Sequence, residues 1–347
     1  DVHDGMAIGF YLVKGMNNLV LNCDAHDNYD GYSEGDSGNV DGFGGHANKE
    51  TSTGNIFRGC RAWNNGDDGF DLINCYASYI IEYCWSFRNG YKPHSIESSG
   101  GNGAGFKSGG YGMGDIKKVP NPIPQHTVRY CLAYYNRQQG FYSNHHLGGL
   151  IFENNTAYKN PSNYNMLNRK SSNEAVDVPG YGHIIKNNLS LSPRNSGGFP
   201  QHLINVDNTL SEIKNNSFAP NDLNLSESDF ESLNEQELMG SRKSDGSLPD
   251  INFLRLTNHA NFRFSGMGCF INEEAVDYSW IQEPAIVLEN GVARIVGEDS
   301  KSFNKFYVNG EEVSIENGIV DLTSMSGELN LKAISENGAV TTLIINK

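Results

Sequence analysis

An eight-residue pattern recurs along the first two thirds of the chain and limits the possible folds more than any other feature. Each copy has Cys or Asn at its third position and Asn five residues later. The clearest copies are "LNCDAHDN" at 21, "RGCRAWNN" at 58, "EYCWSFRN" at 82, "RYCLAYYN" at 129 and "ENNTAYKN" at 153. With weaker copies at 186 and 214, the successive spacings are 37, 24, 47, 24, 33 and 28 residues. Periods of this size are typical of stacked repeats, so we expect a chain that coils, with insertions of varying length.

Composition and local pattern predict that each coil is built from β-strands. Short β-rich stretches such as "NLVL" at 18, "YIIEY" at 79 and "LIF" at 150 precede the repeated pattern. The 347 residues include 39 Gly and 43 Asn, which disfavour helices and favour turns. We therefore expect an all-β protein in which residues 1–220 form a right-handed parallel β-helix.

Equivalent residues of successive coils stack about 4.8 Å apart in such a fold. The stacked cysteines are expected to be small buried groups, with disulfides as the less favoured alternative. The stacked asparagines are expected to form a ladder of side-chain amides. The six cysteines include no CxxC pair, which argues against a structural zinc site.

A second repeated column places a Gly-aromatic pair after each pattern. The copies are "VDGFGG" at 40, "DDGFDL" at 67, "AGFKSG" at 104 and "QGFYSN" at 139, with "YNMLN" at 164 as a degenerate copy. Phe43, Phe70, Phe106, Phe141 and Met166 are predicted to stack inside the coil. Because alternate residues of a strand point to opposite faces, the next residues, Gly44, Asp71, Lys107 and Tyr142, should point outward together.

This alignment brings four carboxylates and one amine onto three adjoining coils. The residues are Asp41, Asp67, Asp68, Asp71 and Lys107. Like charges packed this closely are unfavourable unless a cation lies among them, and an all-carboxylate set suits Ca²⁺. The alternatives are an ordinary acidic turn and an ordinary surface lysine.

The same motifs resemble the family 9 polysaccharide lyases, which are pectin-degrading parallel β-helix enzymes. The resemblance rests on "NVDGFGG", "NNGDDGFDL" and "GNGAGFKSGG", and it extends over about residues 1–220. It implies that Asp41, Asp67, Asp68 and Asp71 bind Ca²⁺ and that Lys107 is the catalytic base. The segment "DGSLPDINFLRL" at 245 looks like the part of the family that follows the helix.

The chemistry that the resemblance implies is β-elimination from a 4-linked galacturonate, in rhamnogalacturonan I or polygalacturonate. Lys107 would remove the C5 proton while calcium neutralises the adjoining carboxylate. Because the ordinary pKa of lysine is about 10.4, an alkaline optimum is expected.

Further contacts to the anionic plant cell-wall polysaccharide are predicted from residues in or just after the repeats, although each could equally be a solvent-exposed side chain. These residues are Arg88, Arg137, Tyr142, Arg169 and Lys170. His145 and His146 lie beside "GFYSN", but the sequence shows no acidic partner for either, so neither is assigned a catalytic role.

Two other functions remain open. A β-helix glycoside hydrolase would use a pair of carboxylic acids, which leaves Lys107 without a role. A non-catalytic glycan-binding protein or adhesin would use the aspartates as a structural calcium site. The formal net charge of −15 disfavours nucleic-acid partners, and no apolar run is long enough to span a membrane. We expect a monomer that is secreted, periplasmic or displayed on the cell surface, the location being implied by the resemblance.

The remaining third of the chain is expected to differ from the helix. Residues 221–284 read as a connecting segment packed on or after the helix, and residues 285–347 as a small sandwich-like antiparallel β-module. Four Asn-Gly steps, at Asn290, Asn309, Asn317 and Asn337, predict its hairpins. The opening stretch "DVHDGMAIGFYLVKG" resembles the middle of a helix, so further N-terminal coils are expected to be missing.

Overall fold

The protein consists of two compact units, Asp1–Asn272 and Glu273–Lys347. The structure, a computed structural model, describes residues 1–32, 37–111, 119–194, 201–270, 285–289, 292–296, 302–315, 319–336 and 340–347. In the described part of the chain, no helix is long and apolar enough to cross a membrane.

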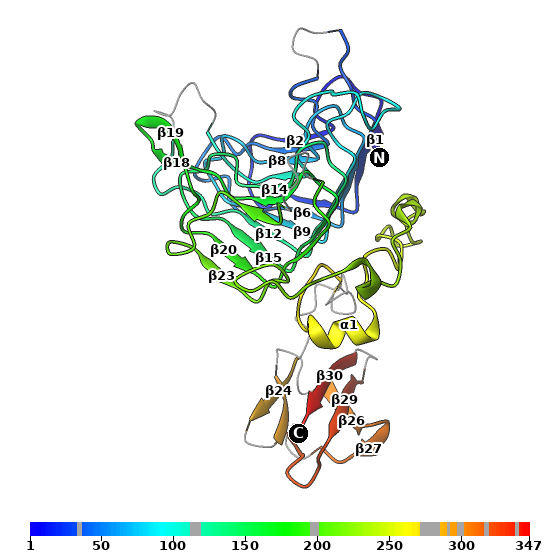
Figure 1. Ribbon diagram of the computed structural model, residues 1–347. Helices are drawn as coiled ribbons and strands as arrows, with labels where there is room; N and C mark the ends of the chain where they lie inside the picture. The colour runs from blue at the N-terminus through cyan, green and yellow to red at the C-terminus, as the bar shows by residue number, and fades with distance from the viewer. Residues whose placement is uncertain are drawn as a thin grey trace. The chain divides into compact units, whose positions relative to one another are not determined.

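The first unit contains three parallel sheets of seven strands each (Figure 1). Sheet A contains β1 (Val2–His3), β4 (Asp24–His26), β7 (Arg61–Trp63), β10 (Trp85–Phe87), β13 (Leu132–Tyr134), β16 (Thr156–Tyr158) and β21 (Leu189–Leu191). Sheet B contains β2 (Phe10–Leu12), β5 (Phe43–Gly45), β8 (Phe70–Asp71), β11 (Phe106–Lys107), β14 (Gln139–Tyr142), β17 (Ser162–Asn165) and β22 (Leu203–Ile204). Sheet C contains β3 (Leu19–Leu21), β6 (Asn55–Arg58), β9 (Tyr79–Glu82), β12 (Thr127–Arg129), β15 (Ile151–Glu153), β20 (Ile184–Lys186) and β23 (Glu212–Lys214). Each coil therefore gives one strand to each sheet, and the predicted parallel β-helix is confirmed.

The asparagine ladder forms inside the coils as predicted. The amide of each buried asparagine donates to the next along the series Asn28, Asn65, Asn89, Asn136 and Asn160, at N···O distances of 2.9 to 3.1 Å. These bonds satisfy polar groups at the corner of each coil, where the turning backbone leaves amides and carbonyls without strand partners. The ladder thus fixes the register of one coil on the next.

Loss of one rung should cost a large part of the stability of the fold. Asn136 donates to Asn160 Oδ1 and to Ser86 O, and it accepts from the backbone and side-chain amides of Asn89. We expect Asn136→Ala to lower the free energy of unfolding by about 3 kcal/mol, because buried partners are left unsatisfied. Urea unfolding followed by tryptophan fluorescence measures this, with the exposed Asn221→Ala as a control. A change below about 0.5 kcal/mol for Asn136→Ala would contradict the role of the ladder.

An aromatic ladder fills the interior beside sheet B. Phe10, Phe43, Phe70, Phe106, Phe141 and Tyr164 stack with ring centroids 4.7 to 5.1 Å apart. The expected last member, Met166, is wrong: the partner of Phe141 in the register is Tyr164. Both side chains are fully buried and lie two residues apart, although Met166 follows the end of β17, so a period of two could not choose between them.

All six cysteines are free, and those of the repeated pattern are buried or half-buried, in agreement with the expected packing role. Their column continues in later coils as the buried asparagines Asn155, Asn188 and Asn216.

Residues 221–270 cover the outward face of sheet A. This segment contains the short helices η2 (Glu227–Asp229), η3 (Glu235–Met239) and α1 (Asn258–Arg263). Its buried side chains, among them Phe253 and Phe264, form a second apolar core with Trp63, Trp85 and Tyr134 of sheet A. Sheet A is therefore covered by protein and is not available for a large ligand.

The second unit is antiparallel. One sheet contains β24 (Ala285–Glu289), β25 (Val292–Val296) and β28 (Ile319–Asp321). The other contains β26 (Phe303–Val308), β27 (Glu311–Val313), β29 (Glu328–Ser335) and β30 (Val340–Asn346). The predicted turn at Asn309-Gly310 has positive φ values of 52° and 87°, as a tight hairpin requires. Asn290, Asn317 and Asn337 lie outside the described residues.

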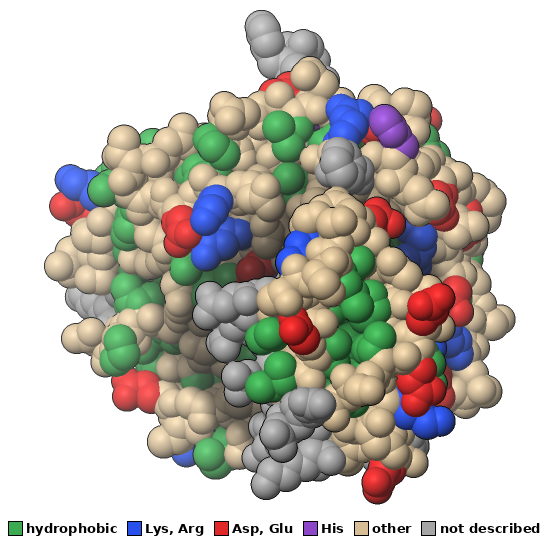
Figure 2. All heavy atoms as spheres, turned by 90° about the horizontal axis from the view of Figure 1, so that it is seen from below, with side chains coloured by type: hydrophobic (Ala, Val, Ile, Leu, Met, Phe, Trp, Pro, Cys, Tyr) green, Lys and Arg blue, Asp and Glu red, His purple; other side chains and the backbone are tan. Residues whose placement is uncertain are grey.

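Charged side chains do not form one large patch on the face drawn in Figure 2. Acidic and basic side chains are scattered there among backbone and uncharged side chains. This agrees with a composition in which 19% of residues are charged.

Candidate active site

The outward column of sheet B brings the predicted polar residues together. Strand pairing aligns Gly44 with Asp71, Asp71 with Lys107, and Lys107 with Tyr142. Figure 1 labels β2, β8 and β14 of this sheet, which alternate with β5 and β11 in the strand order. Residues up to 98 positions apart in sequence thus share one face, because one strand per coil returns to the same sheet.

Three buried carboxylates form the centre of the site. One oxygen from each of Asp41, Asp68 and Asp71 lies within 4.8 Å of the others. A backbone amide holds the Oδ1 atom of each: Asp68 N donates to Asp41, Ala104 N to Asp68, and Ile73 N to Asp71. The carboxylates are therefore anchored by the coils themselves and do not depend on a ligand for their orientation.

Lys107 lies against these carboxylates. Its Nζ atom is 2.9 Å from Asp71 Oδ2 and 3.0 Å from Asp68 Oδ2. The lysine side chain is 13% exposed and that of Asp68 is fully buried, so the pair is shielded from solvent.

Asp67 differs from the other three aspartates in its contacts. Its Oδ1 accepts hydrogen bonds from Asn102 N at 2.6 Å and Gly103 N at 3.3 Å. Gly101 is needed for this approach, since a Cβ there would lie 2.6 Å from Asp67 Oδ1. Arg137 Nη1 in turn donates to Gly101 O and Asn102 O, so this predicted substrate residue supports the loop that binds Asp67.

The electrostatics of the site reflect an excess of negative charge. Burial and the neighbouring carboxylates raise the pKa of Asp41. Burial likewise raises the pKa of Asp68 to about 7, although Lys107 acts in the opposite direction. Burial lowers the pKa of Lys107, but Asp68, Asp71 and Asp41 outweigh it and hold the pKa well above its ordinary value.

The residues fit a divalent cation. Three buried carboxylates face a single ammonium, and Asp68 Oδ2, which lies 3.0 Å from that ammonium, accepts no hydrogen bond from any other described residue. Oxygen-only ligands suit Ca²⁺, which takes six to eight of them, so water and a ligand would have to complete its shell. Asp41, Asp68 and Asp71 would hold the ion, whereas the fourth predicted ligand, Asp67, is not part of this close group.

Three other residues predicted to bind substrate, Arg88, Arg169 and Lys170, do not lie together in the structure. Arg88 follows β10 of sheet A and forms an ion pair with Glu235, so it is not part of the sheet B site. Arg169 and Lys170 lie on β18 (Asn168–Ser171), which forms a hairpin with β19 (Glu174–Val178). Arg169 is buried, whereas Lys170 is exposed and pairs with Glu174 at 2.7 Å.

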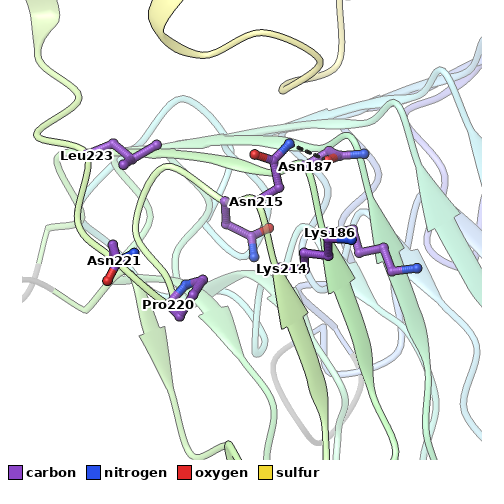
Figure 3. A pocket seen from close by; sticks show the side chains of 8 residues that line it. Lys186, Asn187, Lys214, Asn215, Pro220, Asn221 and Leu223 are labelled. Carbon is purple, nitrogen blue, oxygen red and sulfur yellow. Dashed lines mark hydrogen bonds between the residues drawn. The ribbon is translucent and has the colours of Figure 1, made fainter.

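A pocket of about 460 Å³ lies elsewhere, at the C-terminal end of sheet C (Figure 3). It is lined by Lys186, Asn187, Lys214, Asn215, Asn216, Pro220, Asn221 and Leu223. No carboxylate is among these residues, so the pocket offers neither a calcium site nor an acid-base pair.

Comparison with known proteins decides the family. Residues 1–214 match the family model described as Pel9A-like, right handed beta helix region. The chain belongs to this family. Residues 207–342 match a second model, described as rhamnogalacturonan lyase-like, C-terminal. The resemblance to the family 9 polysaccharide lyases and the right-handed β-helix are thereby confirmed.

The relatives described next are named either pectate lyase or rhamnogalacturonan lyase. The Pel9A-like chain is 35% identical over 265 residues to pectate lyase L of Dickeya chrysanthemi, covering 76% of this chain and 54% of that protein. A solved structure titled rhamnogalacturonan lyase is 56% identical, with a TM-score of 0.71, and the match covers 77% of this chain and 64% of that one. The crystal structure of pectate lyase Pel9A is 34% identical, with a TM-score of 0.58, covering 74% and 56%. This Pel9A-like chain spans about half the length of the pectate lyase L that it matches.

Two histidines lie near the residues of the sheet B site: His46 was not singled out from sequence, and His145 was given no catalytic role. His46 Nδ1 lies 3.1 Å from Tyr11 Oη, and its Nε2 lies 4.0 Å from Asp71 Oδ2. His145 Nδ1 lies 2.5 Å from Asp177 Oδ1, so the absence of an acidic partner for this residue was wrong. Asp177 comes from a hairpin 32 residues further on, a contact for which the repeat contains no signal.

Three other histidines should make this Pel9A-like fold sensitive to acid. His126, His146 and His183 are buried, and the Nδ1 of each accepts a backbone amide hydrogen. Burial lowers the pKa of His146 and of His183 to about 4. An unfolded histidine has a pKa of about 6.5, so stability present above pH 6.5 is lost as the pH falls towards 4.

We expect each of these histidines to remove about 2 kcal/mol of unfolding free energy between pH 7.5 and 5. Urea unfolding at the two pH values should show a smaller pH difference for His183→Gln than for the wild type. His259→Gln, at an exposed position, should leave the difference unchanged. An identical pH difference in His183→Gln and the wild type would refute the assignment.

Proposed function

We propose that this chain carries the catalytic part of a calcium-dependent pectic polysaccharide lyase that cleaves 4-linked galacturonate by β-elimination. The observation that carries the proposal is the contact of Lys107 Nζ with Asp68 and Asp71, at 3.0 and 2.9 Å, within the three-carboxylate cluster. The family relationship and the names of the relatives support it. The polymer is too large to enter a cell intact, which favours a location outside the cytoplasm.

The proposed roles follow from the positions of the side chains. Lys107 removes the C5 proton in its neutral form, and the C4–O bond then breaks to give an unsaturated uronide. Calcium, when bound, would act as a Lewis acid that neutralises the uronate carboxylate beside C5. Without a metal ion, the negative charges of Asp41, Asp68 and Asp71 keep Lys107 protonated. When these carboxylates balance another cation, the amine loses that support and its pKa falls.

For the substrate, we propose rhamnogalacturonan I in preference to polygalacturonate. The chain is 56% identical to the protein titled rhamnogalacturonan lyase, compared with 34% and 35% to those named pectate lyase. The match of residues 207–342 to a rhamnogalacturonan lyase-like region points the same way.

One assay separates this proposal from its alternatives. The protein is incubated with rhamnogalacturonan I or polygalacturonate, with calcium or with a chelator, and absorbance near 235 nm follows the unsaturated product. We expect calcium-dependent growth that is faster on rhamnogalacturonan I. New reducing ends without this absorbance would indicate a glycoside hydrolase, and binding without cleavage would indicate a glycan-binding protein.

A further inference from the structure

Tyr142 is the neighbour of Lys107 on the outward column of sheet B. Strand β14 pairs with β11 so that Tyr142 is the register partner of Lys107. Neighbouring strands lie about 4.8 Å apart, so the phenol stands one coil away from the proposed base. Among the described residues, Asp71 and Tyr142 are the two neighbours of Lys107 in this column. Asp71 binds the ammonium of Lys107, whereas Tyr142 has a hydroxyl proton that it can donate.

Tyr142 is also the first member of a chain of side chains that ends on the β18–β19 hairpin. Its hydroxyl oxygen lies 3.0 Å from His145 Nε2, and His145 Nδ1 lies 2.5 Å from Asp177 Oδ1. Arg169 Nη2 is 3.9 Å from the same carboxylate oxygen. Because Asp177 engages Nδ1, the opposite nitrogen of the imidazole is the one that exchanges a proton with Tyr142.

An uncommon turn brings His145 back towards Tyr142. Asn144 and His145 both adopt the left-handed backbone region, with φ of 55° and 57°. Two contacts hold the turn: Asn144 Nδ2 donates to Gly109 O at 2.7 Å, and His145 N donates to Leu167 O at 2.9 Å. Single non-glycine residues adopt this region at many corners of the coils, but among the described residues only Asn144 and His145 do so consecutively.

We propose that Tyr142 is the acid that protonates the leaving oxygen, and that His145 and Asp177 position its hydroxyl and restore its proton. This inference rests on the lyase function proposed above and assigns it a second catalytic residue. No residue in the sequence analysis was given the acid role.

The step balances without another reactant. Lys107 Nζ takes the C5 proton, the electron pair of that bond forms the C4=C5 double bond, and the C4–O bond breaks with its pair on oxygen. That oxygen takes the proton of Tyr142 Oη. The phenolate takes a proton from His145 Nε2, and water at the partly exposed edge of the imidazole replaces that proton.

The electrostatics of the phenol agree with this role. Burial and Asp177 raise the pKa of Tyr142 to about 12, against the opposing effect of Lys107. The hydroxyl therefore keeps its proton under the alkaline conditions in which a lysine base is neutral.

The test uses Tyr142→Phe in the whole chain, with rhamnogalacturonan I as substrate. We expect kcat to fall about 10²- to 10³-fold with little change in KM, because the proton is needed only in the transition state. Tyr307→Phe, in the second unit, should leave kcat unchanged. Urea unfolding of each variant shows whether its fold is intact.

A leaving group that does not need a proton distinguishes an acid from a merely structural tyrosine. A galacturonide oligomer with fluorine at C4 of its non-reducing end is the probe, and the wild type should release fluoride and form the unsaturated uronide. Tyr142→Phe should lose less than tenfold on this probe, whereas Lys107→Arg should lose activity on both substrates. His145→Gln and Asp177→Asn should follow Tyr142→Phe with smaller losses of about tenfold, and the exposed Asp245→Asn should not.

Two results would overturn the assignment. One is a folded Tyr142→Phe whose kcat on the polymer is within threefold of the wild type. The other is an equal loss on the polymer and on the fluorinated probe, which would make Tyr142 a structural or binding residue. If the wild type forms no unsaturated product from any uronide, the lyase function itself fails, and the acid role with it.

Discussion

Replacing Lys107 by Arg should reduce formation of the unsaturated product about 10³- to 10⁴-fold while the protein remains folded. Arginine keeps the positive charge that lies 3.0 Å from Asp68 and 2.9 Å from Asp71, but it does not lose its proton at any pH at which proteins are stable. The variant therefore removes the base and keeps the counter-ion. Initial rates at 235 nm on rhamnogalacturonan I measure the loss.

The control is Lys92→Ala, which removes an exposed lysine and should leave the rate unchanged. Lys107→Ala provides a second comparison, because it removes the counter-ion as well. Without calcium, we expect Lys107→Ala to lower the free energy of unfolding by about 3 kcal/mol relative to Lys107→Arg, since three buried carboxylates are left unpaired. Retention of more than a tenth of the wild-type rate by Lys107→Arg would exclude this lysine as the base.

Replacing Asp68 by Asn should abolish the response to calcium. Asp68 is fully buried, its Oδ1 is held by Ala104 N, and its Oδ2 lies 3.0 Å from Lys107 Nζ. Asparagine can keep the bond to Ala104 but removes one of the negative charges that hold a divalent cation. We expect the rate on rhamnogalacturonan I to fall about 10³-fold, similar to the effect of a chelator on the wild type.

Stability provides a second measurement for the same variant. Without calcium, Asp68→Asn should be more stable than the wild type, although it is less active. Because burial raises the pKa of Asp68 to about 7, its ionised form destabilises the metal-free fold as the pH rises from 4 through 7. In chelator at pH 8, Asp68→Asn should therefore unfold at a higher urea concentration than the wild type. Added calcium should stabilise the wild type and not the variant.

Asp245→Asn, an exposed aspartate outside the cluster, is the control and should respond to calcium as the wild type does. If Asp68→Asn kept both calcium-induced stabilisation and calcium-dependent activity, the ion would have to bind elsewhere. The pair of measurements thus tests the location of the metal independently of the identity of the base.

The repeat allowed most of the β-helix to be predicted, because one residue of each coil occupies the same place in each sheet. Asn28, Asn65, Asn89, Asn136 and Asn160 were aligned by spacing alone and do form one ladder. The same alignment placed Asp71, Lys107 and Tyr142 in one column, and strand pairing agrees. It failed at Met166, which lies just beyond β17 and two residues after Tyr164; the two positions are equivalent by pattern, and only the backbone register selects Tyr164.

Contacts between a coil and an insertion could not be predicted in this way. Arg88 binds Glu235 of the segment that covers sheet A, and Asp67 binds a loop that Arg137 supports. His145 meets Asp177 through a hairpin that has no counterpart in the other coils. None of these partners occurs at a repeated spacing, so the sequence contains no regularity from which to infer them.

The sequence by itself therefore determined the coil, its stacked columns and the gathering of aspartates around a lysine. These features follow from translation along one axis, which converts a spacing in sequence into a neighbour in space. The tertiary structure decided which carboxylates are close enough to share a cation, which basic side chains are already paired, and where Tyr142 finds its proton partner. Those outcomes depend on the paths of irregular loops, and side chains on such loops meet through packing that no periodic pattern encodes.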